Sequence, residues 1–103
     1  MKDNRIDQDV AERVLAALQE INPVDFSSHD FIHEYCRQNE RDYVNWLVQY
    51  IETDEIFKNA HSQIALFLAK NIGELRPRYH EIGRRESKTV HGTTDTPMWF
   101  AWD

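Results

Sequence analysis

Residues 87–102 read SKTVHGTTDTPMWFAW and contain no helical spacing of apolar side chains. The Thr-Val pair favours a strand, the Gly-Thr-Thr-Asp-Thr-Pro run has the composition of a turn, and aromatic residues dominate the last five positions. In a second strand at 98–102, Met98, Phe100 and Trp102 would share one face. The stretch therefore predicts a β-hairpin near the C-terminus.

The chain before this hairpin has the spacing of helices. Apolar residues recur every three or four positions from 6 to 21, and Pro23 ends this first helix because the residue before a proline disfavours the helical conformation. A serine pair at 27–28 is a good N-cap for a second helical segment, which we expect to break near Asn39. A third helical segment comes next and stops around Gly73.

Length and composition predict one globular domain. The chain has 103 residues, of which 41% are apolar and 29% charged, and its single cysteine excludes an internal disulfide. We expect an N-terminal helix at 1–22, a helical core at 27–75, and a short helix plus the hairpin at 76–102. The first twenty residues contain eight charges and no long apolar run, so we expect no secretory leader. No run of about 18 apolar residues occurs, so we expect a cytoplasmic protein without a membrane span.

The order of these elements resembles the winged-helix branch of the helix-turn-helix proteins over residues 40–102. Residues 61–68, HSQIALFL, are similar to the first helix of such a motif, with a polar start followed by Ile-Ala and Leu. The extra N-terminal helix departs from the pattern. The fold class we expect is therefore mainly α with a C-terminal β-hairpin, a winged-helix-like single domain with an extra N-terminal helix.

The resemblance implies a DNA-binding function. Residues 77–87 would form a short recognition helix, starting near Pro77, that enters the major groove. The presence of Pro77 and Gly83 limits the length of that helix. The turn around Thr93–Thr96 would be the wing.

The charge distribution points to the same segment. Residues 1–75 have a net charge of −7, residues 76–91 have +3, and residues 92–103 have −2, which gives −6 in total. Phosphate attracts such a basic cluster, so we expect double-stranded DNA as the partner. His80, Thr93 and Thr94 are further candidates for contacts with it. The residues expected to contact it are Arg76, Arg78, Arg84, Arg85 and Lys88.

Two other interpretations of the same features stay open. The arginines could simply pair with neighbouring acids such as Glu81 and Glu86 on the surface of the protein. Alternatively, the chain is an acidic protein-interaction module, an adaptor or inhibitor, that binds a partner or a second copy of itself through its acidic helices or through Trp99 and Trp102. Replacing Arg84 and Arg85 would abolish activity only under the DNA-binding hypothesis.

No pattern in the sequence indicates catalysis. There is no phosphate-binding loop, dinucleotide fingerprint or nucleophile elbow, so we expect neither an enzyme nor a cofactor. His29, His33 and Cys36 share one helical face with the spacing of zinc ligands. Because a fourth ligand is not evident and Cys36 borders an apolar stripe, we expect core packing and no metal.

Overall fold

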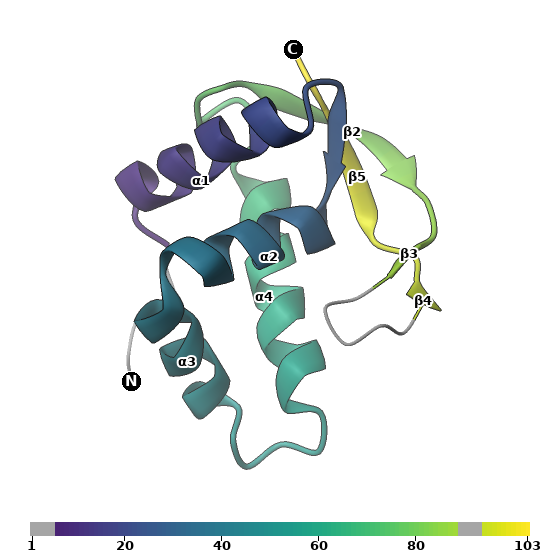
Figure 1. Ribbon diagram of the computed structural model, residues 1–103. Coiled ribbons are helices and arrows are strands. Elements are labelled where there is room, and N and C mark those ends of the chain that lie inside the picture. The colour runs from purple at the N-terminus through teal and green to yellow at the C-terminus, as the bar shows by residue number, and fades with distance from the viewer. Residues whose placement is uncertain (1–5, 89–93) are drawn as a thin grey trace.

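The computed structural model describes residues 6–88 and 94–103 and contains four helices and five strands in that part of the chain (Figure 1). No helix in these ranges is long and apolar enough to cross a bilayer. In chain order the elements are α1 (Gln8–Ile21), β1 (Asp25–Ser27), α2 (Ser28–Gln38), α3 (Glu40–Gln49), α4 (Ile56–Lys70), β2 (Tyr79–Arg84), β3 (Ser87–Lys88), β4 (Thr94–Asp95) and β5 (Met98–Trp102).

The helix boundaries agree with the signals in the sequence. The helix α1 ends at Ile21, just before Asn22-Pro23, and Asn39 separates α2 from α3 with a non-helical backbone, so both predicted boundaries are confirmed. At the start of α2, the Asp30 amide donates to Ser27 Oγ at 3.1 Å, and the Ser27 amide donates to Asp30 Oδ2 at 2.9 Å. This reciprocal pair is a capping box, and it fixes where α2 begins.

Three strands form an antiparallel sheet in the order β1-β5-β2, so the last strand lies in the centre. The predicted strand at 98–102 is confirmed, but its partners are β1 and β2. Opposite each other in the register, Phe26 on β1 and Phe100 on β5 stack with ring centroids 5.3 Å apart. The short strands β3 and β4 extend the β2–β5 hairpin, and residues 89–91 of the expected first strand lie outside the described residues.

The expected short helix at 77–87 is wrong, because β2 occupies this region. Tyr79 anchors the strand: its ring is 1% exposed, and its hydroxyl donates to the Leu68 carbonyl of α4 at 2.6 Å. The strand contains a bulge between Glu81 and Gly83, where glycine adopts a φ of 113° that other residues rarely adopt. The side chain of Thr93, expected in the wing turn, lies outside the described residues.

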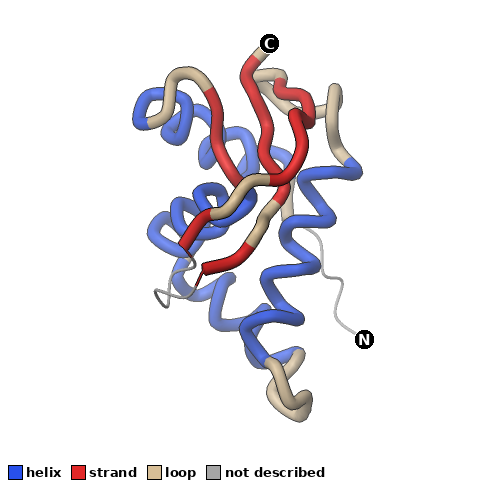
Figure 2. Tube along the Cα trace, turned by 90° about the vertical axis from the view of Figure 1, so that its right-hand side faces the viewer, coloured by secondary structure: helices blue, strands red, loops and turns tan. Residues whose placement is uncertain are grey.

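One hydrophobic core joins the helices to the sheet. Its largest fully buried side chains come from α1, α2, α4 and all three strands of the main sheet. The strands form one layer and the helices pack behind it (Figure 2). The described residues therefore form a single unit of four helices and a three-stranded sheet, which confirms a mainly α single domain, while the expected hairpin belongs to a larger sheet.

Candidate nucleic-acid interface

The predicted basic cluster is divided between the two ends of β2. Before the strand, the Arg76 guanidinium donates to the Gly73 carbonyl at 3.3 Å, and the carbonyl of Arg78 accepts from the Asp103 amide at 3.0 Å. Arg84 is the last residue of the strand. Since a strand rises about 3.3 Å per residue, roughly 17 Å or more separates Arg78 from Arg84. The five residues therefore do not form one patch.

Arg84 and Arg85 themselves point to different surroundings. Arg84 Nη1 donates to the Thr96 carbonyl at 3.2 Å, and Arg84 borders a groove that also contains residues of α2 and α4. Arg85 Nη2 lies 3.2 Å from Asp25 Oδ2, and its guanidinium lies 4.7 Å from the centre of the Trp99 ring. The charge of Arg85 is therefore partly balanced by Asp25. The fifth residue, Lys88, lies in β3 of the hairpin extension.

The groove beside Arg84 has a volume of about 270 Å³ and runs between α2, α4 and the hairpin. Small residues of α4 leave it open, because Ser62, Ala65 and Ala69 project too little to fill it. His29 and His61 also line the groove, so imidazoles from two helices lie on the same concave surface as the Arg84 guanidinium.

The helix α4 presents an outward face that sequence reasoning missed. Lys58, Ser62, Leu66 and Lys70 are exposed and stand four residues apart, which puts them along one side of the helix. The opposite side, with Ala60, Ile64 and Leu68, is fully buried. Residues 56–73 contain no Asp or Glu in a chain with eighteen acids, and this gap is the signal that could have identified the face.

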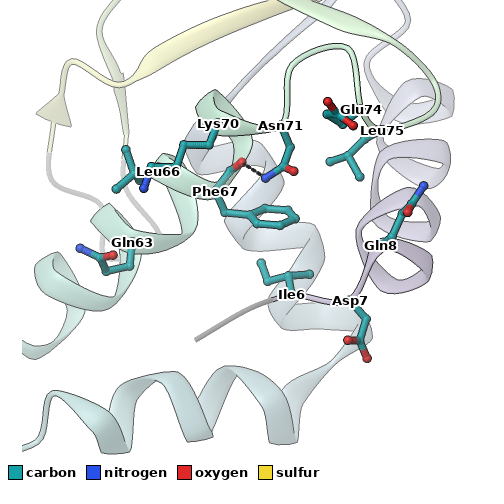
Figure 3. Close-up of a pocket in the computed structure, with 10 residues that line it drawn as sticks. All are labelled: Ile6, Asp7, Gln8, Gln63, Leu66, Phe67, Lys70, Asn71, Glu74 and Leu75. Atoms are coloured by element: carbon teal, nitrogen blue, oxygen red, sulfur yellow. Dashed lines mark hydrogen bonds between the residues drawn. The ribbon is translucent and has the colours of Figure 1, made fainter. Parts of the chain in front are cut away.

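A second concavity lies on the other side of α4 (Figure 3). It has a volume of about 710 Å³ and is bordered by the start of α1, the C-terminal half of α4 and the turn after it. Leu66 lines both this concavity and the groove beside Arg84, so α4 stands as a ridge between two hollows. The residues around the larger one are Ile6, Asp7, Gln8, Gln63, Leu66, Phe67, Lys70, Asn71, Glu74 and Leu75.

The possible ligands on α2 form no metal site in the described residues. No group of three or more His, Cys, Asp or Glu side chains is arranged there to hold an ion. Cys36 is half-buried, and this burial raises the pKa of its thiol. The nearby negative charge of Glu40 raises the pKa further, by a smaller amount. A raised pKa leaves less thiolate, which is the form that binds metals and attacks substrates.

The two tryptophans of β5 bond within the protein. Trp102 Nε1 donates to the Asn22 carbonyl at 2.7 Å, and its ring lies 4.6 Å from that of Phe26. Trp99 Nε1 donates to the Arg85 carbonyl at 3.1 Å. Trp102 therefore has a packing role, while Trp99 lies at the surface beside Arg85.

The site residues expected from the sequence thus separate into three places. Arg76 and Arg78 lie at the start of β2, Arg84 borders the groove beside α4, and Arg85 lies with Trp99 on another side of the hairpin. No protein-family model matches the chain, and its comparison with curated proteins and with solved structures also finds no match.

Proposed function

We propose that this protein binds double-stranded DNA through the outward face of α4 and the adjoining β2–β5 hairpin, in a winged-helix arrangement. In this proposal α4 is the recognition helix and the hairpin is the wing. The recognition helix is thus the element that directly precedes the hairpin, instead of the helix expected at 77–87.

The observation that carries the proposal is the charge of α4. It has two lysines and no acid, whereas the whole chain has a net charge of −6. Glu55, just before the helix, lies 3.4 Å from Lys58 Nζ and balances part of its charge, while Lys70 stands at the other end. A helix without acids can approach phosphate closely, and the Arg84 guanidinium beside it adds a further positive charge. The acidic remainder of the chain would be repelled from DNA, which favours one orientation of the protein.

The side chains on α4 suit contacts in a major groove. Lys58 and Lys70 would bind phosphate near the two ends of the helix, while Ser62 and Gln63 would reach base edges. A glutamine amide can form two hydrogen bonds with adenine, and Leu66 would contact the methyl group of thymine. Because only three or four cations contribute, affinity for random DNA is weak and strongly dependent on salt.

Fluorescence anisotropy of a labelled random-sequence duplex, at about 50 and about 200 mM salt, tests this proposal. The variant Lys58→Ala/Arg84→Ala removes one charge from the first turn of α4 and one beside the groove, and the control Arg76→Ala/Arg78→Ala removes two at the other end of β2. We expect the first to reduce the slope of log affinity against log salt by about two and the control to change it little. Absence of binding at low salt, or equal loss in both variants, would overturn the proposal.

A second candidate function is supported by the surface around Trp99. Ile21 and Val24 are 62% and 74% exposed and border the same concavity as Trp99. Exposed apolar residues around a tryptophan are typical of a site that binds another protein. If this surface carries the function, Trp99→Ala abolishes binding of the partner protein while the affinity for DNA is unaffected.

A further inference from the structure

The helix α3 is apolar over more of its circumference than its packing in one molecule requires. Its inner side chains are Tyr43, Trp46, Leu47 and Tyr50, which lie in the core or pack against it. Beyond these, Val44 and Val48 are 52% and 55% exposed, and Ile51 just after the helix is 61% exposed.

These residues form one continuous apolar arc. At about 100° per residue, the arc from Trp46 through Leu47 to Val48 spans roughly 200°. A helix that packs on one side only needs an apolar stripe of roughly 100°. The Tyr50 and Ile51 amides donate to the carbonyls of Leu47 and Val48, so the turn after α3 continues the surface. The outer half of the arc is therefore a second packing face without a partner in the described residues.

We propose that a second copy of this chain covers this outer face, with the two α3 helices antiparallel across a two-fold axis at Val48. Val44 lies four residues before Val48 and Ile51 lies three residues after it, so the exposed side chains are spaced almost symmetrically about Val48. In an antiparallel pair Val48 meets Val48 of the partner subunit, and Val44 meets Ile51 of the partner subunit. Such self-complementarity is what a two-fold interface requires.

The charges at the ends of the stripe favour the same arrangement. Arg41 lies one turn before Val44, is exposed, and belongs to none of the ion pairs within the described residues. Glu52 and Asp54 come after the stripe and are also exposed. An antiparallel pair brings each Arg41, with its exposed acidic neighbours Glu40 and Asp42, towards these two acids of the other molecule, whereas a parallel pair would bring the more acidic ends at 52–55 together.

The proposed interface leaves the surface of α4 accessible. The side of α3 that faces α4 carries Tyr43, which bonds to His61, whereas Val44 and Val48 lie on the outer side. Figure 1 shows α3 and the β2–β5 hairpin on opposite sides of α4. Three half-exposed aliphatic side chains bury far less than the roughly 800 Å² per partner of a stable complex, so the dimer is weak and reversible.

Sedimentation velocity of the full chain from about 10 µM to about 1 mM tests for a dimer of this strength. We expect the sedimentation coefficient to rise with concentration for the natural sequence. Val48→Glu places two charges against each other on the axis and should weaken association at least about tenfold. Its control, Gln49→Glu, adds the same charge to a neighbouring exposed position and should still dimerise. A monomer at the highest concentration, or equal behaviour of the two variants, would overturn the proposal.

Disulfide crosslinking tests the geometry even if Val48→Glu does not fold. Under mild oxidation Val48→Cys should give a covalent dimer, because the two positions meet on the axis. Gln49→Cys should give much less, and the natural chain reports any reaction of Cys36. Crosslinking at position 49 that equals that at position 48 would exclude the antiparallel pairing. A charge reversal supplies the third arm: Arg41→Glu should weaken the dimer, and Glu52→Lys in the same chain should restore it.

Discussion

Tyr43 Oη and His61 Nε2 lie 2.6 Å apart and connect α3 to α4. Burial raises the pKa of Tyr43 to about 12, so its hydroxyl is protonated in the ordinary pH range, and the tautomer of His61 decides whether the hydroxyl or the imidazole donates. The bond holds the rim of the groove beside Arg84, because His61 is one of the residues that line it.

We expect Tyr43→Phe to lower the free energy of unfolding by about 1 kcal/mol, since it removes one part-buried hydrogen bond and keeps the ring. Urea unfolding of Tyr43→Phe, His61→Ala and the double variant measures the coupling between the two residues. The double variant should lose less than the sum of the single variants. Strict additivity would show that the hydrogen bond contributes nothing to stability.

Alkaline pH should destabilise the protein. Burial raises the pKa of Tyr35 to about 12, as it does for Tyr43, and it raises the pKa of Tyr79 as well. In this range the unfolded chain releases protons that the native state retains, so stability falls as the pH rises from about 10 towards 12. Ultraviolet absorbance of phenolate should increase together with the loss of helical circular dichroism. Ionisation of all tyrosines near pH 10 in a folded protein would contradict this prediction.

Acid should also destabilise the protein, in part through Glu34. Burial opposes ionisation of this side chain, but hydrogen bonds from Arg37 and Gln38 outweigh it and hold the pKa below its usual value of 4.5. A lowered pKa means that the native state favours the charged form, so this contribution is present above pH 4.5 and is lost as the pH falls below it. Unfolding at a series of pH values should give a shallower acid dependence for Glu34→Gln than for the natural chain. Glu40→Gln is the exposed control.

The capping box should contribute measurably to α2. We expect Ser27→Ala to lower the free energy of unfolding by about 1 kcal/mol, because the Asp30 amide loses its acceptor. Ser27→Asp keeps an acceptor at the same position and should retain more of the stability. If both variants are equally unstable, the buried environment of Ser27 matters more than the cap.

Phe26 should be among the most sensitive positions in the core. Its ring is fully buried and contacts Tyr79, Phe100 and Trp102. Phe26→Ala should therefore cost about 3–5 kcal/mol, whereas Phe26→Leu should cost clearly less. Chemical denaturation, monitored by tryptophan fluorescence, measures the loss of stability. Trp102 contributes to this signal because it packs on the Phe26 ring. A small effect of both variants would show that the sheet tolerates a cavity here.

The elements predicted correctly are those with local signals. The apolar spacing of α1, the polar break at Asn39 and the aromatic strand β5 are visible in short windows of sequence. The strands β1 and β2 carry no such signal. The first has only three residues, and the second buries only Tyr79 because it lies at the edge of the sheet, so neither alternates clearly. Both depend on pairing with distant residues.

The candidate site likewise combines features that are visible in short stretches of sequence with features that depend on the fold. Arg84 and Arg85 are adjacent in sequence, and a charge count cannot tell that one borders the groove and the other meets Asp25. A charge count also cannot show that Arg76 and Arg78 are separated from Arg84 by the length of β2. The absence of acids from α4 is readable from the sequence, but the apolar spacing of that segment favours a purely structural role.

The central position of β5 sets the order in which this protein can acquire its sheet during translation. Synthesis proceeds from the N-terminus, so β1 and β2 leave the ribosome before the strand that joins them. Until residues 98–102 emerge, the rings of Phe26 and Tyr79 have no Phe100 to pack against. The aromatic side chains of β1 and β2 therefore gain their central packing partner only when residues 98–102 have been added to the chain.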